Sequence, residues 1–193
     1  MHSVLDASGA RSPLIVGVGG TTRAGSSSER MLRYALDAAA QRGAVTEIYA
    51  GPALDMPMYS PDLVDRTDNA RRLVDALRRC DGVIVASPGY HGSFSGLIKN
   101  ALDYTEDMAR DDRVYLESRP VGLIACAAGW QATGGTLQGL RTVIHALRGW
   151  PTPLGVAVNS AEAPFDEGGS PKAAVRTQLD TLASQVVDAA ARF

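Results

Sequence analysis

Apolar and polar positions follow two different periods along this chain. Short apolar runs rich in branched side chains predict buried strands near residues 14–18, 45–49, 83–87, 121–126 and 154–158. Apolar residues at three- to four-residue spacing predict amphipathic helices near 28–42, 67–79, 97–104, 137–148 and 172–193. Strands and helices thus alternate, and this order indicates an α/β fold with a doubly wound parallel sheet and helices on both faces.

The segments between these elements set the expected domain organisation. Residues 1–13 read as a flexible polar N-terminal tail, and residues 14–193 as a single domain, which suits a chain of 193 residues. The highly charged stretch 105–119 is predicted to be a surface excursion. Residues 127–135 are predicted to be a loop of small residues that contains Trp130.

Three loops of unusual composition follow the first, third and fourth predicted strands. They are rich in Gly, Ser and Thr, and each carries aromatic or charged residues. A five-stranded sheet of order 2-1-3-4-5 brings these loops together at the carboxyl ends of the strands, where such sheets bind ligands. The pattern predicts a flat, phosphate-bearing ligand across them.

The first of these loops joins a strand to a helix through glycines and hydroxyls. Backbone amides and a helix N-terminus favour a phosphate there, and Arg23 can add charged N–H groups. A Walker loop is excluded because Ser26 stands in place of its Lys, and a dinucleotide fingerprint because Thr22 replaces a glycine. A phosphate-monoester site and a Ser-rich helix cap with a surface Arg remain equal alternatives for this loop alone.

Composition narrows the function classes further. The net charge of −2 and pI near 5.9 give no basic surface for nucleic acid. No apolar run is long enough to cross a membrane, and residues 1–13 lack a signal pattern. Two cysteines form no disulfide framework, so we expect the cytoplasm, and three scattered histidines offer no metal site.

Two motifs carry a family resemblance. Residues 20–28, GTTRAGSSS, resemble the Gly-Ser-x-Arg-x-x-Ser-x-Asn phosphate loop of the NADPH-dependent FMN reductase family. Residues 87–104, SPGYHGSFSGLIKNALDY, resemble the flavin loop and following helix of that family, usually Pro-Glu-Tyr-Asn/His-Gly-Ser and then Leu-Lys-Asn-Ala-Leu-Asp. The likeness covers residues 14–158, and the second motif is the specific one. Gly89 and Ser28 depart from the usual Glu and Asn.

The resemblance implies a flavodoxin-like fold, FMN as cofactor, NADPH or NADH as hydride donor, and the following residue roles. The FMN phosphate would be held by Thr21, Arg23, Ser26 and Ser28. The isoalloxazine would be lined by Pro88, Gly89, Tyr90, His91, Gly92 and Ser93, with Gly129 approaching from the fourth loop. No side chain is expected to be catalytic and no metal is expected.

Three residues near the predicted ring site keep two interpretations each. Tyr90 packs against the ring or fills its own loop, and the ligand role is favoured. Trp130 covers the ring or anchors a partner interface. Cys126 lies near the site or is a buried core residue, and burial is favoured.

The resemblance implies a flavoprotein oxidoreductase that passes electrons to free flavin or another small-molecule acceptor. A quinone, azo or nitro reductase and a non-enzymatic flavodoxin-type carrier are the alternatives. The near balance of 19 basic and 21 acidic residues argues against a carrier. Expected partners are a flavin-dependent monooxygenase that receives reduced flavin, and further copies of the chain in a homodimer or tetramer. Apolar residues at Leu97, Ile98, Ala101, Leu102 and Met108 add to the expectation of an oligomer.

Overall fold

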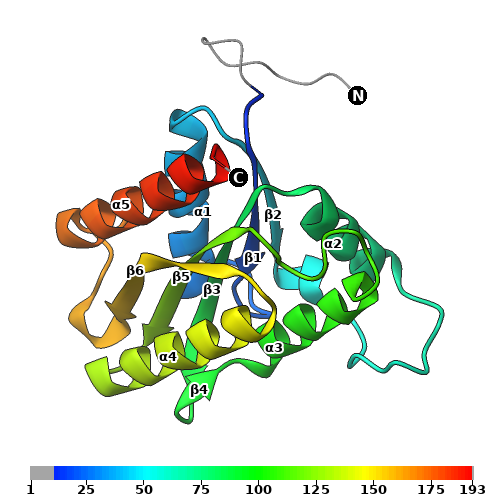
Figure 1. The fold of residues 1–193 in the computed structure, drawn as a ribbon. Helices are drawn as coiled ribbons and strands as arrows, with labels where there is room; N and C mark the ends of the chain where they lie inside the picture. Colours follow the sequence, from blue (N-terminus) through cyan, green and yellow to red (C-terminus); the bar gives the residue numbers. More distant parts are fainter. Residues whose placement is uncertain (1–10, 193) are drawn as a thin grey trace.

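A computed structural model of the chain describes residues 11–192 and contains a twisted parallel sheet between two helical layers (Figure 1). The parallel strands are Leu14–Gly19 (β1), Val45–Ala50 (β2), Gly82–Tyr90 (β3), Pro120–Ala127 (β5) and Trp150–Asn159 (β6). Their order is β2-β1-β3-β5-β6, and the short strand Ser93–Phe94 (β4) pairs antiparallel with β3. The predicted flavodoxin-like fold and the strand order are confirmed.

Residues 11–192 contain five α-helices, of which four connect strands and the last follows β6, and they divide between the two faces of the sheet (Figure 1). They are Ser27–Gln41 (α1), Asp68–Arg79 (α2), Gly96–Asp103 (α3), Trp130–Ala146 (α4) and Ala173–Ala190 (α5). Short 3-10 helices cover Gly51–Leu54, Tyr104–Met108 and Ser160–Glu162. One core lies between the sheet and α1 and α5, and the other lies under α2, α3 and α4.

Hydroxyl side chains begin three of the helices, as the sequence pattern indicates. Ser26, Thr67 and Ser95 each accept a backbone N–H of the first turn, which satisfies one donor that the helix leaves free. Helix α1 ends before Gly43, whose φ of 88° favours glycine. Two of these caps, Ser26 and Ser95, follow β1 and β4 and so fix the helix starts beside the carboxyl edge of the sheet.

Strand β6 begins at Trp150, four residues before the predicted start at 154, and two further elements also extend beyond their predicted boundaries. Strand β3 runs on to Tyr90 because it pairs with β4 in a hairpin, so Pro88 and Gly89 lie in the strand rather than in a loop. Helix α4 begins at Trp130, seven residues before the expected start at 137. Gly134 and Gly135 in its first turns reduce intrinsic helix propensity although both positions have room for a Cβ, whereas a Cβ on Gly139 would lie only 3.2 Å from the Phe94 ring.

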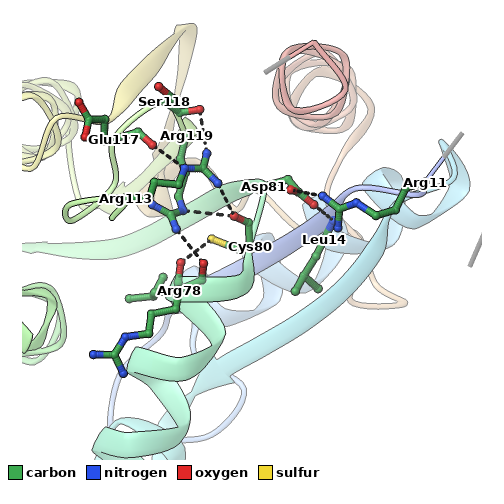
Figure 2. A network of polar contacts seen from close by, with 10 residues as sticks. Arg11, Leu14, Arg78, Cys80, Asp81, Arg113, Glu117, Ser118 and Arg119 are labelled. Atoms are coloured by element: carbon green, nitrogen blue, oxygen red, sulfur yellow. Dashed lines mark hydrogen bonds and ion pairs between the residues drawn. The ribbon is translucent and has the colours of Figure 1, made fainter. Parts of the chain in front are cut away.

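The prediction that residues 105–119 form a surface excursion is wrong in its main point. Thr105, Met108, Leu116 and Arg119 are fully buried. The charges that suggested exposure are partly engaged in the interior: the Arg119 guanidinium donates to the carbonyls of Cys80, Tyr115 and Arg78. Arg113 donates to the same Cys80 carbonyl, as Figure 2 shows. These four buried side chains anchor the segment on the end of α2, so it packs against the fold although its other residues are partly or fully exposed.

Asn100 and Tyr104, from the second half of the flavin-loop motif, also stabilise the fold. Asn100 accepts the amide of Tyr59 at 2.8 Å and donates to the Pro57 carbonyl at 2.9 Å, and the Tyr104 hydroxyl donates to the same carbonyl at 3.0 Å. Asn100 and Tyr104 are both buried. They fix the segment after β2 against α3.

Two expectations concern the tail and the oligomer. Residues 1–10 of the predicted tail lie outside the described residues, whereas Ser12 is buried and the Pro13 carbonyl accepts the amide of Val45. Of the apolar residues that suggested an oligomer, Ile98, Ala101, Leu102 and Met108 are buried within the monomer, which leaves partly buried Leu97. The homodimer or tetramer stays a prediction, and it now depends on the family resemblance alone.

Residues 11–192 show neither a membrane-spanning helix nor a cluster of metal ligands. No helix there has the length and apolar character needed to cross a membrane. Within the same residues, no group of three or more His, Cys, Asp or Glu side chains is arranged to hold a metal ion.

Candidate active site

A cleft of about 350 Å³ lies at the carboxyl edge of the sheet. Its walls come from the loop after β1, the end of β3, the end of β5 and the segment after β6. These four chain segments meet because the strand order changes direction between β1 and β3, as it does at ligand sites of doubly wound sheets. The lining residues are Thr21, Arg23, Ser26, Ser27, Ser28, Pro88, Gly89, Tyr90, Cys126, Ala127, Ala128 and Ser160.

Seven of the eleven residues expected to hold FMN line this cleft. They are Thr21, Arg23, Ser26, Ser28, Pro88, Gly89 and Tyr90. His91, Gly92 and Ser93 lie in the β3–β4 hairpin beyond it, and Gly129 follows the lining residue Ala128. The residues that sequence reasoning did not assign to the site are Ser27, Ala127, Ala128 and Ser160, together with Cys126, which is both buried and part of the lining.

The loop after β1 presents one uncommitted cation to the cleft. Arg23 is exposed, and its guanidinium makes no hydrogen bond or ion pair with any of residues 11–192. Thr21, in contrast, is engaged within the loop, since its hydroxyl accepts the Arg23 amide and donates to the Arg23 carbonyl, both at 3.1 Å. The amides of Ser27 and Ser28 stand in the first turn of α1, where the helix offers them no carbonyl.

The buried carboxylate of Glu29 fixes the conformation of the same loop. Glu29 accepts the Gly25 amide at 2.9 Å and the Arg33 guanidinium at 2.7 and 3.0 Å. With Ser26 as N-cap, this is a variant of the capping box in which Glu reaches one residue further back. Glu29 thereby fixes the turn that carries Arg23, and Arg33 neutralises its charge.

The end of β3 has no room for a side chain at position 89. A Cβ on Gly89 would lie 2.5 Å from Thr136 Oγ1 and 2.9 Å from Ala127 Cβ, both closer than real contacts. Thr136 is fully buried on α4 and donates to the Ala132 carbonyl. The Glu that is frequent at this position of the family motif is therefore excluded here by the close approach of α4.

The hairpin between β3 and β4 explains the His-Gly dipeptide. Tyr90 pairs with Ser93, so His91 and Gly92 are the two central residues of the turn. Their φ angles are 50° and 87°, and a type I′ turn requires positive φ at both positions. Asn-Gly is the preferred pair in such turns, so the backbone accounts for the Asn that often replaces His91 in the family pattern.

We expect His91→Asn to retain the rate of flavin reduction by NAD(P)H and to leave stability equal or slightly higher. His91→Val should lower the free energy of unfolding by roughly 1–2 kcal/mol, because a β-branched residue tolerates positive φ poorly. Urea unfolding measures the stabilities, and rapid mixing with saturating FMN measures the reduction step. A hundredfold slower reduction in His91→Asn, with FMN still bound, would instead make His91 a participant in the chemistry.

The ends of β5 and β6 are joined by a polar bridge. Asn159 Oδ1 accepts the amides of Gly129 at 2.8 Å and Ala161 at 3.1 Å. Gly129 has φ 106° and is the N-cap residue of α4 without a side-chain cap. Asn159 therefore positions both the Ala127–Gly129 turn and the segment with Ser160. In the sequence, an amide side chain at the end of the last strand is the feature that could have predicted this positioning role.

Burial determines the protonation state of the two cysteine thiols. Desolvation raises the pKa of Cys126 to about 12 and that of Cys80 to about 11, so both thiols are protonated at neutral pH. Cys126 thus lines the cleft without being a nucleophile.

We expect neither thiol to react appreciably with a disulfide reagent at pH 8 in the folded protein, and both to react in denaturant. Counting released thiolate by absorbance before and after addition of guanidinium chloride checks this. Rapid modification of one thiol in the native state would show that its environment is open to the reagent and that its pKa is not raised.

A second hollow of about 360 Å³ lies at the edge strand β2, lined by Glu47, Ile48, Tyr49, Ala53, Asn69 and Arg72. Glu47 is paired there with Arg79 and accepts the Tyr49 hydroxyl. This hollow lies away from the change in strand order and contains neither sequence motif. We therefore assign the candidate site to the cleft at the carboxyl edge.

The family assignment follows from the comparison with known proteins. The family model described as NADPH-dependent FMN reductase matches residues 13–163, which contain every lining residue of the cleft. The chain belongs to this family. Its members are NAD(P)H-dependent flavin oxidoreductases, and the cofactor pair of the family is FMN with NADPH.

Individual relatives agree with this assignment. An FMN-dependent NADPH-azoreductase of Staphylococcus aureus is 31% identical over 117 residues, which cover 61% of this chain and 58% of the relative. FerB, a flavoenzyme NAD(P)H:(acceptor) oxidoreductase from Paracoccus denitrificans, superposes with a TM-score of 0.72 at 19% identity, covering 90% of this chain and 97% of FerB. A WrbA-like flavodoxin from Agrobacterium tumefaciens superposes with a TM-score of 0.64 at 16% identity, covering 94% and 99%. The two structures share the fold.

The residues of the cleft fit FMN. A dianionic phosphate matches a free guanidinium beside first-turn amides and hydroxyls, the donor set of the loop after β1. The walls formed by Gly89 and by Ala127–Ala128 carry little or no side chain, so backbone groups are accessible to a flat ring. The volume is within the range of small-molecule sites.

Proposed function

We propose that this chain is an NAD(P)H-dependent FMN reductase that delivers electrons to free flavin or another small-molecule acceptor. The observation that carries the proposal is the Arg23 guanidinium, which lines the cleft and has no hydrogen-bond or ion-pair partner among residues 11–192. A charged donor without a protein partner at a helix N-terminus suits a phosphate monoester. Membership of the family supplies the redox chemistry.

The chain's own residues have binding and positioning roles in this proposal. Bound FMN would supply the two-electron redox chemistry that links nicotinamide oxidation to reduction of the acceptor. Arg23 and the amides of Ser27 and Ser28 bind the phosphate, and backbone groups of Gly89 and Ala127 contact the ring. Hydride transfer requires alignment rather than a side-chain acid or base, so no residue is assigned to proton transfer.

The proposal is tested by two measurements on the purified protein. Titrations should give a lower Kd for FMN than for riboflavin, because only FMN carries the phosphate. NADPH and NADH oxidation should then require FMN and should be followed with free FMN, a quinone and an azo dye as acceptors. Equal affinity for the two flavins together with no nicotinamide oxidation would overturn the proposal.

An azoreductase is the second candidate, because the curated Staphylococcus aureus relative carries that name. A higher kcat/KM for an azo dye than for free FMN would favour it. A non-enzymatic carrier is distinguished by a simpler observation, since it would not consume NADPH in air when no other protein is present.

A further inference from the structure

The rim of the cleft carries a large aromatic side chain that the fold leaves in solvent. Trp130 is 57% exposed, and Trp150, the other tryptophan of the chain, is 60% exposed. The two differ in position, because Trp130 begins α4 at the carboxyl edge of the sheet whereas Trp150 begins β6 at the opposite edge. Only Trp130 is adjacent to the candidate site.

The indole of Trp130 is held in place. Its Nε1 donates to Glu162 Oε1 at 2.8 Å, and the same oxygen accepts Asn159 Nδ2 at 2.9 Å. Asn159 in turn accepts the amide of Gly129, directly before Trp130. This closed set of hydrogen bonds connects the start of α4 with the segment after β6 and restricts the ring to one orientation.

The held ring lies between two segments that line the cleft. Ala128, two residues before Trp130, and Ser160, two residues before Glu162, are both lining residues. Across the end of β5, Tyr90 lines the cleft from β3 and is 53% exposed. Tyr90 is thus an exposed aromatic residue of the lining, and Trp130 is an exposed aromatic residue beside the lining, two positions from Ala128.

We propose that Trp130, oriented by Glu162, is a stacking surface for planar aromatic electron acceptors, such as quinones, azo dyes or flavins. The proposal rests on the proposed function and specifies its acceptor class. A ring that is already immobilised loses little conformational entropy when a second ring stacks on it, which favours binding. An acceptor without an aromatic ring gains nothing from Trp130.

The kinetic test uses the FMN-loaded protein with saturating NADPH and two acceptors, menadione as a planar quinone and ferricyanide as an ion without a ring. We expect Trp130→Ala to raise the KM for menadione roughly tenfold, the size of one aromatic stacking contact. The KM for ferricyanide should be unchanged. Trp130→Phe, which keeps a ring, should restore most of the menadione KM, and Trp150→Ala is the matched control that should behave as wild type.

The role of Glu162 is that of a positioning residue, and it has its own pair of variants. Glu162→Ala frees the indole and should raise the menadione KM by a smaller factor than Trp130→Ala. Glu162→Gln keeps an oxygen that can accept the indole N–H, so its menadione KM should be close to that of the wild type. Equal changes for menadione and ferricyanide in these variants, or no change in Trp130→Ala, would overturn the proposal.

A binding measurement keeps this inference separate from the proposed function. In Trp150→Phe, Trp130 is the sole tryptophan, and menadione should quench its emission saturably; in Trp130→Phe, the remaining emission of Trp150 should not be quenched saturably. This readout needs no turnover. If the wild type neither binds FMN nor oxidises NADPH, the proposed function fails, while saturable quenching still decides for or against stacking on Trp130.

Discussion

Arg23→Ala is expected to raise the Kd for FMN by about ten- to a hundredfold, since a charge-assisted hydrogen bond contributes roughly 1.5–3 kcal/mol. The guanidinium is exposed at the cleft and has no partner among residues 11–192, so the substitution removes no contact of the folded chain. Stability should therefore be unchanged while affinity falls. Flavin fluorescence titration at fixed ionic strength measures the Kd.

Two controls separate a phosphate contact from a general effect of charge. Arg42→Ala removes the same charge from the opposite, exposed end of α1 and should leave FMN affinity unchanged. Riboflavin, which lacks the phosphate, should bind wild type and Arg23→Ala equally. A parallel loss of affinity for riboflavin would place Arg23 against another part of the flavin and contradict the phosphate assignment.

Arg119→Met is expected to lower the free energy of unfolding by about 1–3 kcal/mol, because two part-buried hydrogen bonds are lost and each contributes roughly 0.5–1.5 kcal/mol. The carbonyls of Tyr115 and Arg78 each lose the Arg119 donor at 2.9 Å, whereas the Cys80 carbonyl keeps Arg113 (Figure 2). Burial lowers the pKa of the Arg119 guanidinium, yet it remains a cation at neutral pH. Urea unfolding followed by circular dichroism measures the loss.

The matched control is Arg79 at the end of α2, next to the Arg78 carbonyl that accepts Arg119. Arg79→Ala breaks a surface ion pair with Glu47 at 3.2 Å and should cost less than about 1 kcal/mol. Arg119→Lys, which keeps the charge but presents fewer fixed donors, should be intermediate. If Arg119→Met were as stable as wild type, water or neighbouring groups would have to satisfy the exposed carbonyls, and the anchoring role would be wrong.

The local elements that the sequence predicts well are those with strong periodic or capping signals. Thr67 and Gly43 mark the ends of helices where the pattern indicates, and each predicted strand is present, with β1, β3 and β5 buried and the edge strand β2 partly exposed. The ion pair of Lys99 with Asp103, one helical turn apart, is present at 2.5 Å. These features depend on neighbours within a few residues, which a sequence displays directly.

Boundaries set by distant contacts could not be found in this way. Helix α4 begins at Trp130 despite its glycines, because the β3–β4 hairpin packs against it. The charged segment 105–119 is anchored by buried Arg119 because carbonyls at the end of α2, some forty residues earlier in the chain, accept its guanidinium. Charge alone predicts solvent exposure, and only tertiary structure supplies the buried acceptors.

The sequence by itself determined the fold class, the family and the loop that carries Arg23, since these depend on period and motif. Only the tertiary structure decided which residues share the cleft. It brought Ser160, which follows β6, into the lining, placed His91 in a hairpin turn outside it, and connected Trp130 to Glu162. The physical reason is that a parallel sheet gathers the ends of separate strands at one edge, and these side-chain contacts form only when packing fixes the backbone.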